Sequence, residues 1–215
     1  MSVMDSINLS PEEIQTPRGA ADLYPWVLDR IESIKATPNG KSAIRFRKEL
    51  CKPLIEELLP LGLLCECFFE RSPEVRVELV LGNQNYDAIV TDQRRNAVVF
   101  PQRIEVTQSH EGEDEHLRML HLEQEGHVSL FGPVRKSGTK KTGISVSVEN
   151  EAKSHTEVVN RQRTLVQEAI DRKLTRTYEP DTALLVVFDD LIAIRNDSDC
   201  GVFRNLLLDN RATLL

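Results

Sequence analysis

The spacing of apolar residues predicts several helices. In most of them, apolar side chains recur every three or four residues, which places them on one face of a helix. Segment 111–125 is predicted as a strongly charged helix. The predicted helices are 20–35, 41–59, 111–125, 150–174 and 200–208. Before them, a capping box at Ser10 to Glu13 predicts one short helical turn in an otherwise loose leader.

Other segments have the pattern of strands. Residues 75–81 alternate between apolar and polar side chains, as a half-buried strand does. The continuous apolar run Ala183–Phe188 predicts a strand buried on both faces. Further predicted strands are 63–69, 86–90, 97–100 and 104–107, together with a hairpin formed by 126–134 and 143–148. The order of helices and strands predicts an α/β fold with a mixed central sheet flanked by helices.

The same segments predict the domain organisation. We expect residues 1–36 to form an N-terminal leader and helix, and residues 37–215 to form a single α/β domain. A basic hairpin insertion is expected at about 126–149. A chain of 215 residues is long enough for one sizeable domain with such additions.

Composition narrows the class of protein. The chain is 40% hydrophobic and 28% charged, which is typical of soluble proteins, and its longest apolar run is too short to span a membrane. The four cysteines lack the spacing of a zinc site, so we expect free thiols and a cytoplasmic location. The net charge of −7 provides no overall positive field for nucleic acid, so binding would need a local basic surface.

Two carboxylates stand out in the predicted strands. Asp87 and Glu105 are each flanked by apolar and β-branched residues, and a hairpin can bring them together at the edge of a sheet. Paired carboxylates can hold a hard divalent cation such as Mg²⁺, which prefers oxygen ligands and keeps water for chemistry. Strand alternation places Glu105 and Thr107 on one face. The alternative is that both carboxylates are simply polar residues at strand ends.

This arrangement resembles the PD-(D/E)XK, or restriction-endonuclease-like, nuclease superfamily. In that family an Asp ends one core strand, and a (D/E)-x-K tripeptide lies on the next. Asp87 matches the Asp, Glu105 matches the second acid, and Thr107 occupies the position of the Lys. Tyr86 occupies the position of the Pro. The resemblance covers about residues 41–190 and implies an α-β-β-β-α-β core.

The resemblance also implies a metal and a set of catalytic residues. Asp87, Glu105 and the backbone carbonyl of Val106 would hold Mg²⁺ or Mn²⁺. Because Thr cannot supply a cation, either Arg118 or Lys153 would have to replace the missing Lys. The family's first core helix often carries an acid that faces the metal, and Glu57 is a candidate for that role; the alternative is an exposed glutamate.

The predicted hairpin has the most basic segment of the chain at its tip. Arg135, Lys136, Lys140 and Lys141 could lie along a phosphate backbone. The alternative is that these residues only keep an exposed hairpin tip in solution.

Three functions are compatible with these features. The first is a divalent-metal-dependent nuclease with nucleic acid as its substrate. The second is a catalytically inactive nuclease-fold protein that binds nucleic acid, a protein partner or a second copy of itself. The third is a metal hydrolase that uses the histidine-rich segment His110 to His127. No membrane partner is expected.

Overall fold

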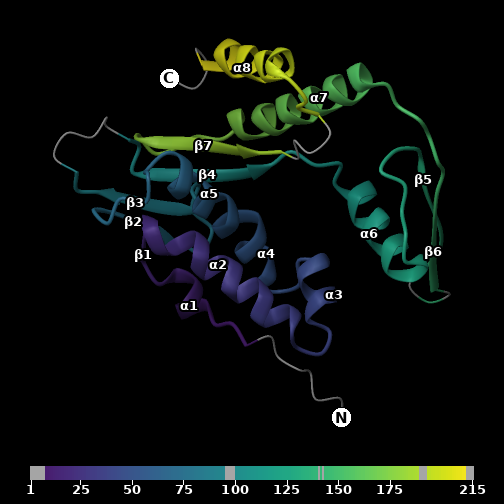
Figure 1. The fold of residues 1–215 in the computed structure, drawn as a ribbon, viewed down its shortest axis with the longest axis horizontal. Coiled ribbons are helices and arrows are strands. Elements are labelled where there is room, and N and C mark those ends of the chain that lie inside the picture. Colours follow the sequence, from purple (N-terminus) through teal and green to yellow (C-terminus); the bar gives the residue numbers. More distant parts are fainter. Residues whose placement is uncertain (1–7, 95–99, 140, 142, 189–192, 212–215) are drawn as a thin grey trace. The chain divides into compact units, whose positions relative to one another are not determined.

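The computed structural model describes residues 8–94, 100–139, 141, 143–188 and 193–211 (Figure 1). The chain divides into two compact units. The sheet unit comprises residues 1–107 and 176–187, and the hairpin unit comprises residues 108–175 and 188–215. The predicted strand 97–100 lies largely outside the described residues.

Among the residues that the structure describes, the sheet unit contains a mixed sheet of five strands. Its order is β1 (Arg18–Gly19), β2 (Val75–Leu79), β3 (Ala88–Asp92), β4 (Arg103–Gln108) and β7 (Thr182–Val187). The first four strands are antiparallel neighbours, with Val77 opposite Val90 and Ala88 opposite Ile104. The Arg103 amide donates to the Asp181 carbonyl over 3.1 Å, which joins the start of β4 to the start of β7, so these two strands run in the same direction. The expected α/β class and mixed central sheet are confirmed.

Helices of the sheet unit come mostly from the N-terminal third of the chain. They are α1 (Pro11–Gln15), α2 (Ala20–Lys35), α3 (Gly40–Arg45), α4 (Cys51–Pro53), the π-helical turn η1 (Leu54–Leu58) and α5 (Leu59–Cys67). The continuous helix predicted over 41–59 is wrong, because left-handed backbone at Arg47 and Glu49 interrupts it between α3 and α4.

The prediction of a strand at 63–69 is also wrong. This segment lies largely in α5, which packs against α2. A short apolar run has no periodicity that distinguishes a buried strand from a buried helix, so only packing decides between them. The two helices approach closely at Gly62, where a Cβ atom would lie 3.0 Å from the Cα atom of Tyr24.

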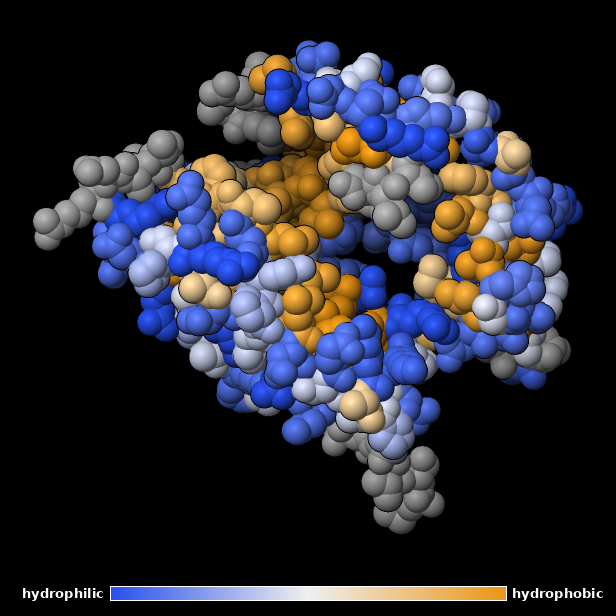
Figure 2. All heavy atoms as spheres, viewed as in Figure 1, coloured by the Kyte–Doolittle hydropathy of each residue, from blue (hydrophilic) through white to orange (hydrophobic). Residues whose placement is uncertain are grey.

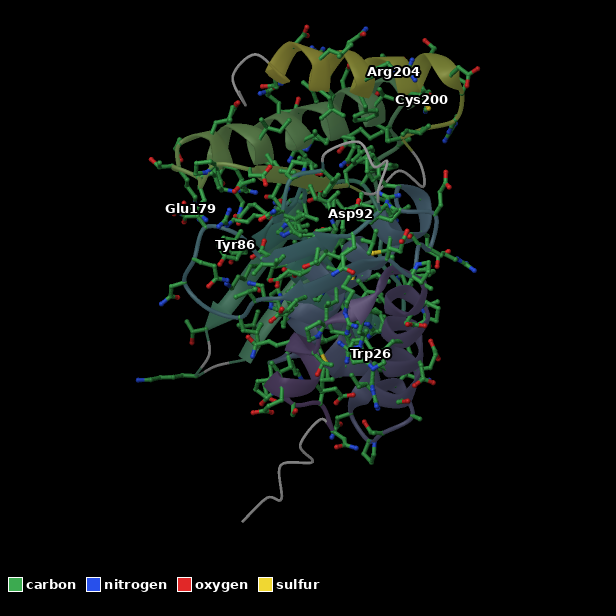
Figure 3. The ribbon with its side chains drawn as sticks, turned by 90° about the vertical axis from the view of Figure 1, so that its left-hand side faces the viewer. Trp26, Tyr86, Asp92, Glu179, Cys200 and Arg204 are labelled. Carbon is green, nitrogen blue, oxygen red and sulfur yellow. The ribbon has the colours of Figure 1, made fainter. Side chains whose placement is uncertain are left out.

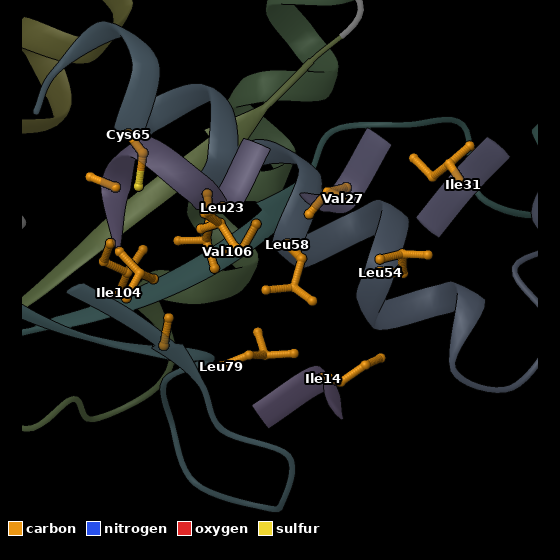
Figure 4. Close-up of a cluster of buried hydrophobic side chains, with 14 of the residues drawn as sticks. Ile14, Leu23, Val27, Ile31, Leu54, Leu58, Cys65, Leu79, Ile104 and Val106 are labelled. Carbon is orange, nitrogen blue, oxygen red and sulfur yellow. The ribbon is translucent and has the colours of Figure 1, made fainter. Parts of the chain in front are cut away.

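One hydrophobic core holds the sheet unit together. Ile14, Leu23 and Val27 from the N-terminal segment are fully buried and share this core with Leu58 and Ile104. Figure 4 shows these side chains pointing toward one another between the helices and the strands. The described part of the N-terminal segment, residues 8–35, therefore contributes to the folded core.

Strand β7 is less buried than its continuous apolar pattern predicts, since all six of its residues are only half-buried. The reason is its position, because β7 is the last strand in the order of the sheet. An edge strand has a neighbour on one side only. The prediction of the strand is confirmed, and the prediction of its complete burial is wrong.

In its described residues, the hairpin unit contains three helices and a two-stranded sheet. These elements are α6 (Glu113–Glu125), β5 (Val134–Thr139), β6 (Gly143–Val148), α7 (His155–Leu174) and α8 (Asp197–Arg211). A capping box begins α7, in which Ser154 accepts from the Glu157 amide and the Glu157 side chain accepts from the Ser154 amide. The charged helix, the long helix, the final helix and the second strand of the hairpin are confirmed, some with shifted ends. The first hairpin strand, predicted over 126–134, is wrong, because the chain pairs with β6 only from Val134 to Thr139, so Arg135 and Lys136 lie in β5 rather than at the tip.

None of the helices in the described part of the chain has the length and apolar character needed to span a membrane. On the face shown in Figure 2, hydrophilic residues are interspersed with hydrophobic ones. Several large hydrophobic side chains are exposed on both units: Leu28, Leu63, Phe68, Leu130, Leu207 and Leu208.

Candidate functional site

Asp87 directly precedes β3 and is bound to the backbone of β4 on both sides of Glu105. The Asp87 amide donates to the Ile104 carbonyl over 2.8 Å. The Val106 amide donates to Oδ2 of Asp87 over 2.7 Å. These two bonds place the Asp87 side chain beside the strand that carries Glu105. As expected from the sequence, the pairing of β3 with β4 brings Asp87 close to the part of β4 that carries Glu105.

Glu105 and Thr107 are buried in the middle of the sheet. Glu105 is 3% exposed and Thr107 is 4% exposed. Along β4 they alternate with Ile104 and Val106, which belong to the hydrophobic core. A buried carboxylate is costly unless an opposite charge or hydrogen bonds compensate it. Glu105 therefore requires compensation.

Part of that compensation comes from Arg176. Its Nη1 atom lies 3.5 Å from Oε1 of Glu105, and the Arg176 side chain is half exposed. The pair thus combines a buried carboxylate with a guanidinium that reaches it from the solvent. Sequence reasoning does not identify Arg176, because residues 176–181 follow the predicted long helix and have no pattern of their own.

A third carboxylate, Glu57, comes from the π-helical turn η1. Pro60 follows this turn and has no N–H to donate to the carbonyl of Glu56, which disfavours a regular α-helical turn here. Burial and the nearby charges of Asp87, Glu56 and Glu105 raise the pKa of Glu57 to about 7. Three acidic groups from η1, the start of β3 and β4 therefore influence one another. Single π-helical turns are frequent at functional sites.

The segment before β7 is attached to the same region by hydrogen bonds. Asn85 Nδ2 donates to the Thr177 carbonyl over 2.9 Å, and Arg103 Nη1 donates to the Pro180 carbonyl over 3.1 Å. In Figure 3, Tyr86 and Glu179 accordingly lie near one another. These contacts hold Arg176 and Tyr178 close to Asp87 and the beginning of β4.

Tyr178 carries a buried hydroxyl group. Within the described part of the chain, no group is in hydrogen-bonding position to its Oη atom. Burial and the negative charges of Glu105 and Asp87 raise the pKa of Tyr178, which keeps the hydroxyl protonated at neutral pH. A hydrogen-bond donor without a partner is therefore located near the acidic groups. Sequence reasoning misses it, because only the pairing of β7 with β4 brings it there.

The donor set suits a hard divalent cation bound by few protein ligands. Among the residues that the structure describes, no three His, Cys, Asp or Glu side chains form a group that could hold a metal ion. Mg²⁺ is usually bound by one or two carboxylates, with waters and substrate phosphates completing its coordination. Asp87 and Glu105 fit this pattern, with the carbonyl of Val106 as a third oxygen. The proposed metal site therefore requires only two side-chain ligands.

Two cations predicted to replace the missing Lys belong to the hairpin unit. Arg118 donates to the carbonyls of Ser129 and Gly132, over 3.0 and 2.6 Å, and so attaches α6 to the loop before β5. Lys153 pairs with Glu151. These contacts give both residues a role within their own unit, and their catalytic role stays a prediction.

The basic residues of the hairpin have acidic neighbours. Arg135 pairs with Glu149 over 2.8 Å, and Lys136 pairs with Glu113 over 2.9 Å. Lys141 is exposed, and Lys140 lies outside the described residues. The two ion pairs reduce the positive charge that this hairpin offers to a phosphate backbone.

The histidines of the predicted metal hydrolase are engaged in local contacts. His110 Nδ1 accepts from the Gly112 amide, and ring nitrogens of His121 and His127 lie 3.0 and 3.1 Å from the carbonyls of Val146 and Glu125. In each ring the contact uses Nδ1 and leaves Nε2, a nitrogen through which histidine binds metals. Among the described residues, however, these histidines form no group of three with other His, Cys, Asp or Glu side chains that could hold a metal ion.

No protein-family model, curated protein or solved structure matches the chain. We therefore infer the function of the chain from its own residues and their contacts.

Proposed function

We propose that the protein is a divalent-metal-dependent nuclease of PD-(D/E)XK type. One observation supports this most strongly: the Asp87 carboxylate is hydrogen-bonded to the Val106 amide, beside Glu105 and within electrostatic reach of Glu57. The order of elements also supports the proposal. Helix α5 is followed by β2, β3 and β4, and later by α7 and β7. With α6, β5 and β6 taken as an insertion between β4 and α7, this is the α-β-β-β-α-β order of the family's core.

In the proposed site, Asp87, Glu105 and the Val106 carbonyl would hold Mg²⁺ or Mn²⁺. When bound, the ion would lower the pKa of a water and neutralise charge that develops on the phosphate. Glu57 exchanges a proton near neutral pH, because its pKa is about 7, and can accept the proton of the attacking water. Two of the three carboxylates would thus hold the ion, and the third would accept the proton.

Calorimetry with Mn²⁺ tests the metal site. We expect the wild type to bind Mn²⁺, and we expect Asp87→Asn and Glu105→Gln to lose binding while remaining folded. Asp92→Asn is the matched control, because Asp92 lies at the other end of β3 and pairs with Arg94. Cleavage of single-stranded and duplex DNA and RNA in Mn²⁺ then tests the nuclease activity. An absence of Mn²⁺ binding by the wild type, with nucleic acid present, would contradict the proposal.

A catalytically inactive nuclease-fold protein is the second candidate. The ion pair between Arg176 and Glu105 favours it, because a guanidinium already neutralises one of the two carboxylates. Thr107 at the position of the Lys favours it as well. Such a protein would bind nucleic acid, a protein partner or a second copy of itself. Binding of nucleic acid that is unaffected by Mn²⁺ and by Asp87→Asn would support this candidate over the nuclease.

A further inference from the structure

We propose that Arg176 and Tyr178 bind the scissile phosphate of the substrate, and that Arg176 supplies the cation that Thr107 lacks. This inference rests on the proposed nuclease function and adds two residues to the same site. Asp87 and Glu105 keep their proposed role as metal ligands. Arg176 and Tyr178 have a different role, because their side chains donate hydrogen bonds to an anion and do not bind a metal.

The position of the two residues carries the argument. The hydrogen bonds from Asn85 to Thr177 and from Arg103 to Pro180 fix the segment between them against the residues that precede β3 and begin β4. Arg176 reaches Glu105 over 3.5 Å. Within one short segment, therefore, a guanidinium and a hydroxyl group both approach the proposed metal ligands.

Arg176 has the freedom and the chemistry to exchange partners. Its side chain is 50% exposed, whereas Glu105 is almost entirely buried. A divalent ion at Glu105 would compensate the buried carboxylate and release the guanidinium. Arginine binds phosphate through two parallel hydrogen bonds, which a single Lys ammonium cannot reproduce. The ion pair is thus the substrate-free position of a phosphate-binding side chain.

Tyr178 supplies the second, independent observation. Its Oη atom is buried, and among the described residues no acceptor is in hydrogen-bonding position to it. Buried polar groups are nearly always paired, so an orphaned hydroxyl calls for a specific explanation. A phosphate oxygen beside the metal ligands would accept the hydrogen bond that this hydroxyl offers.

The test compares Arg176→Gln, Arg176→Lys and Tyr178→Phe with the wild type. Arg71→Gln and Tyr24→Phe are matched controls in the sheet unit, because Arg71 is exposed on its surface and Tyr24 lies on α2. Each variant is measured for Mn²⁺ binding by calorimetry and for single-turnover cleavage of a duplex DNA oligonucleotide in Mn²⁺. Unfolding curves show that each variant is folded.

We expect all three variants to retain Mn²⁺ binding. Cleavage should fall about 100-fold in Arg176→Gln, as for the loss of one donor to a developing oxyanion, and Arg176→Lys should recover part of the rate. Tyr178→Phe should lower the rate by roughly three- to tenfold, as for the loss of one neutral hydrogen bond. The controls should cleave at the wild-type rate.

The outcomes separate this inference from the proposed function. If the wild type binds Mn²⁺ and cleaves DNA, while Arg176→Gln and Tyr178→Phe cleave at the same rate, the inference is wrong and the nuclease function stands. If Arg176 and Tyr178 only stabilise the fold, their variants will have changed unfolding curves and an unchanged cleavage rate, and the inference is again wrong. If the wild type neither binds Mn²⁺ nor cleaves DNA, both proposals are wrong.

Discussion

At the scale of single residues, Asp87 has a structural task as well as a proposed chemical one. Its Oδ2 atom satisfies the Val106 amide, which would otherwise be a donor without its partner in the middle of the sheet. A lost hydrogen bond to a buried donor costs more than the bond itself contributes, because the donor remains desolvated. Substitutions at this position can therefore separate folding from metal binding.

We expect Asp87→Ala to lower the free energy of unfolding by about 1–3 kcal/mol, because it removes the acceptor of the Val106 amide. Asp87→Asn keeps a carbonyl oxygen as acceptor and should cost less. Both variants should lose Mn²⁺ binding. Urea denaturation and calorimetry measure the two effects on the same samples. Equal stability of the two variants would contradict a role for the hydrogen bond.

The raised pKa of Glu57 predicts a dependence of stability on pH. In the folded protein the pKa is about 7, and in the unfolded chain it is near the ordinary value of 4.5. The folded state therefore holds the proton more tightly between these values, so stability falls as pH rises from 4.5 to 7. The free energy of unfolding falls by at most roughly 3 kcal/mol over this range. Because Glu57 is partly exposed, solvent screening makes the actual decrease smaller.

We accordingly expect Glu57→Gln to be more stable than the wild type at pH 8 and equally stable at pH 4, because the variant cannot ionise. Thermal or urea unfolding at the two pH values measures this difference. Glu56→Gln, in the same turn, is the matched control, and its difference from the wild type should change less with pH. If the stability of Glu57→Gln depends on pH in the same way as that of the wild type, the raised pKa of Glu57 is wrong.

At the scale of elements, the contact of α2 with α5 sets the position of η1. Gly62 permits this contact, since a Cβ atom there would lie 3.0 Å from Tyr24 Cα. The helix that contains Gly62 continues directly from the turn that carries Glu57. Packing of α5 therefore positions one of the three carboxylates.

We expect Gly62→Ala to lower the free energy of unfolding by about 1 kcal/mol. Overpacking against α2 costs roughly 1–3 kcal/mol, and the higher helix propensity of alanine returns up to about 1 kcal/mol. Gly201→Ala in α8 is the control, because a Cβ atom added there would have no atom of the described residues within 4 Å. The control should be unchanged or more stable in thermal unfolding, and a stabilising Gly62→Ala would contradict the close contact.

At the scale of the whole molecule, charge limits the affinity for nucleic acid. The net charge of −7 repels a phosphate backbone, so binding depends on local basic groups. Two of the basic residues in the β5–β6 hairpin, Arg135 and Lys136, are already paired with acids. Phosphate contacts by these residues would appear in the salt dependence of binding.

If the hairpin contacts phosphates, we expect Lys136→Ala to weaken binding of a DNA oligonucleotide and to lower the slope of log affinity against log salt by about 0.9 for duplex DNA. Its stability should change by less than about 1 kcal/mol, because the ion pair with Glu113 is exposed. Glu113→Gln should strengthen binding, since it releases the lysine. Fluorescence anisotropy at several salt concentrations measures these values. An unchanged slope in Lys136→Ala would exclude this phosphate contact.

Local pattern in the sequence determined much of the secondary structure. Alternation at 75–81 predicted β2, and apolar residues at helical spacing predicted α7, because both periodicities are properties of neighbouring residues. Pattern also singled out Asp87 and Glu105 as a pair on neighbouring strands. It failed at 63–69, where burial on several sides removes the periodicity that separates a helix from a strand.

Only the tertiary structure decided which distant groups meet at the candidate site. Arg176 and Tyr178 approach Glu105 because β7 pairs with β4, and this pairing joins segments more than seventy residues apart. Glu57 joins them because the core places η1 near the start of β3. Such encounters depend on long-range packing, in which a residue's neighbours in space differ from its neighbours in the chain. The carboxylate pair was therefore visible in the sequence, whereas the donors beside it required the fold.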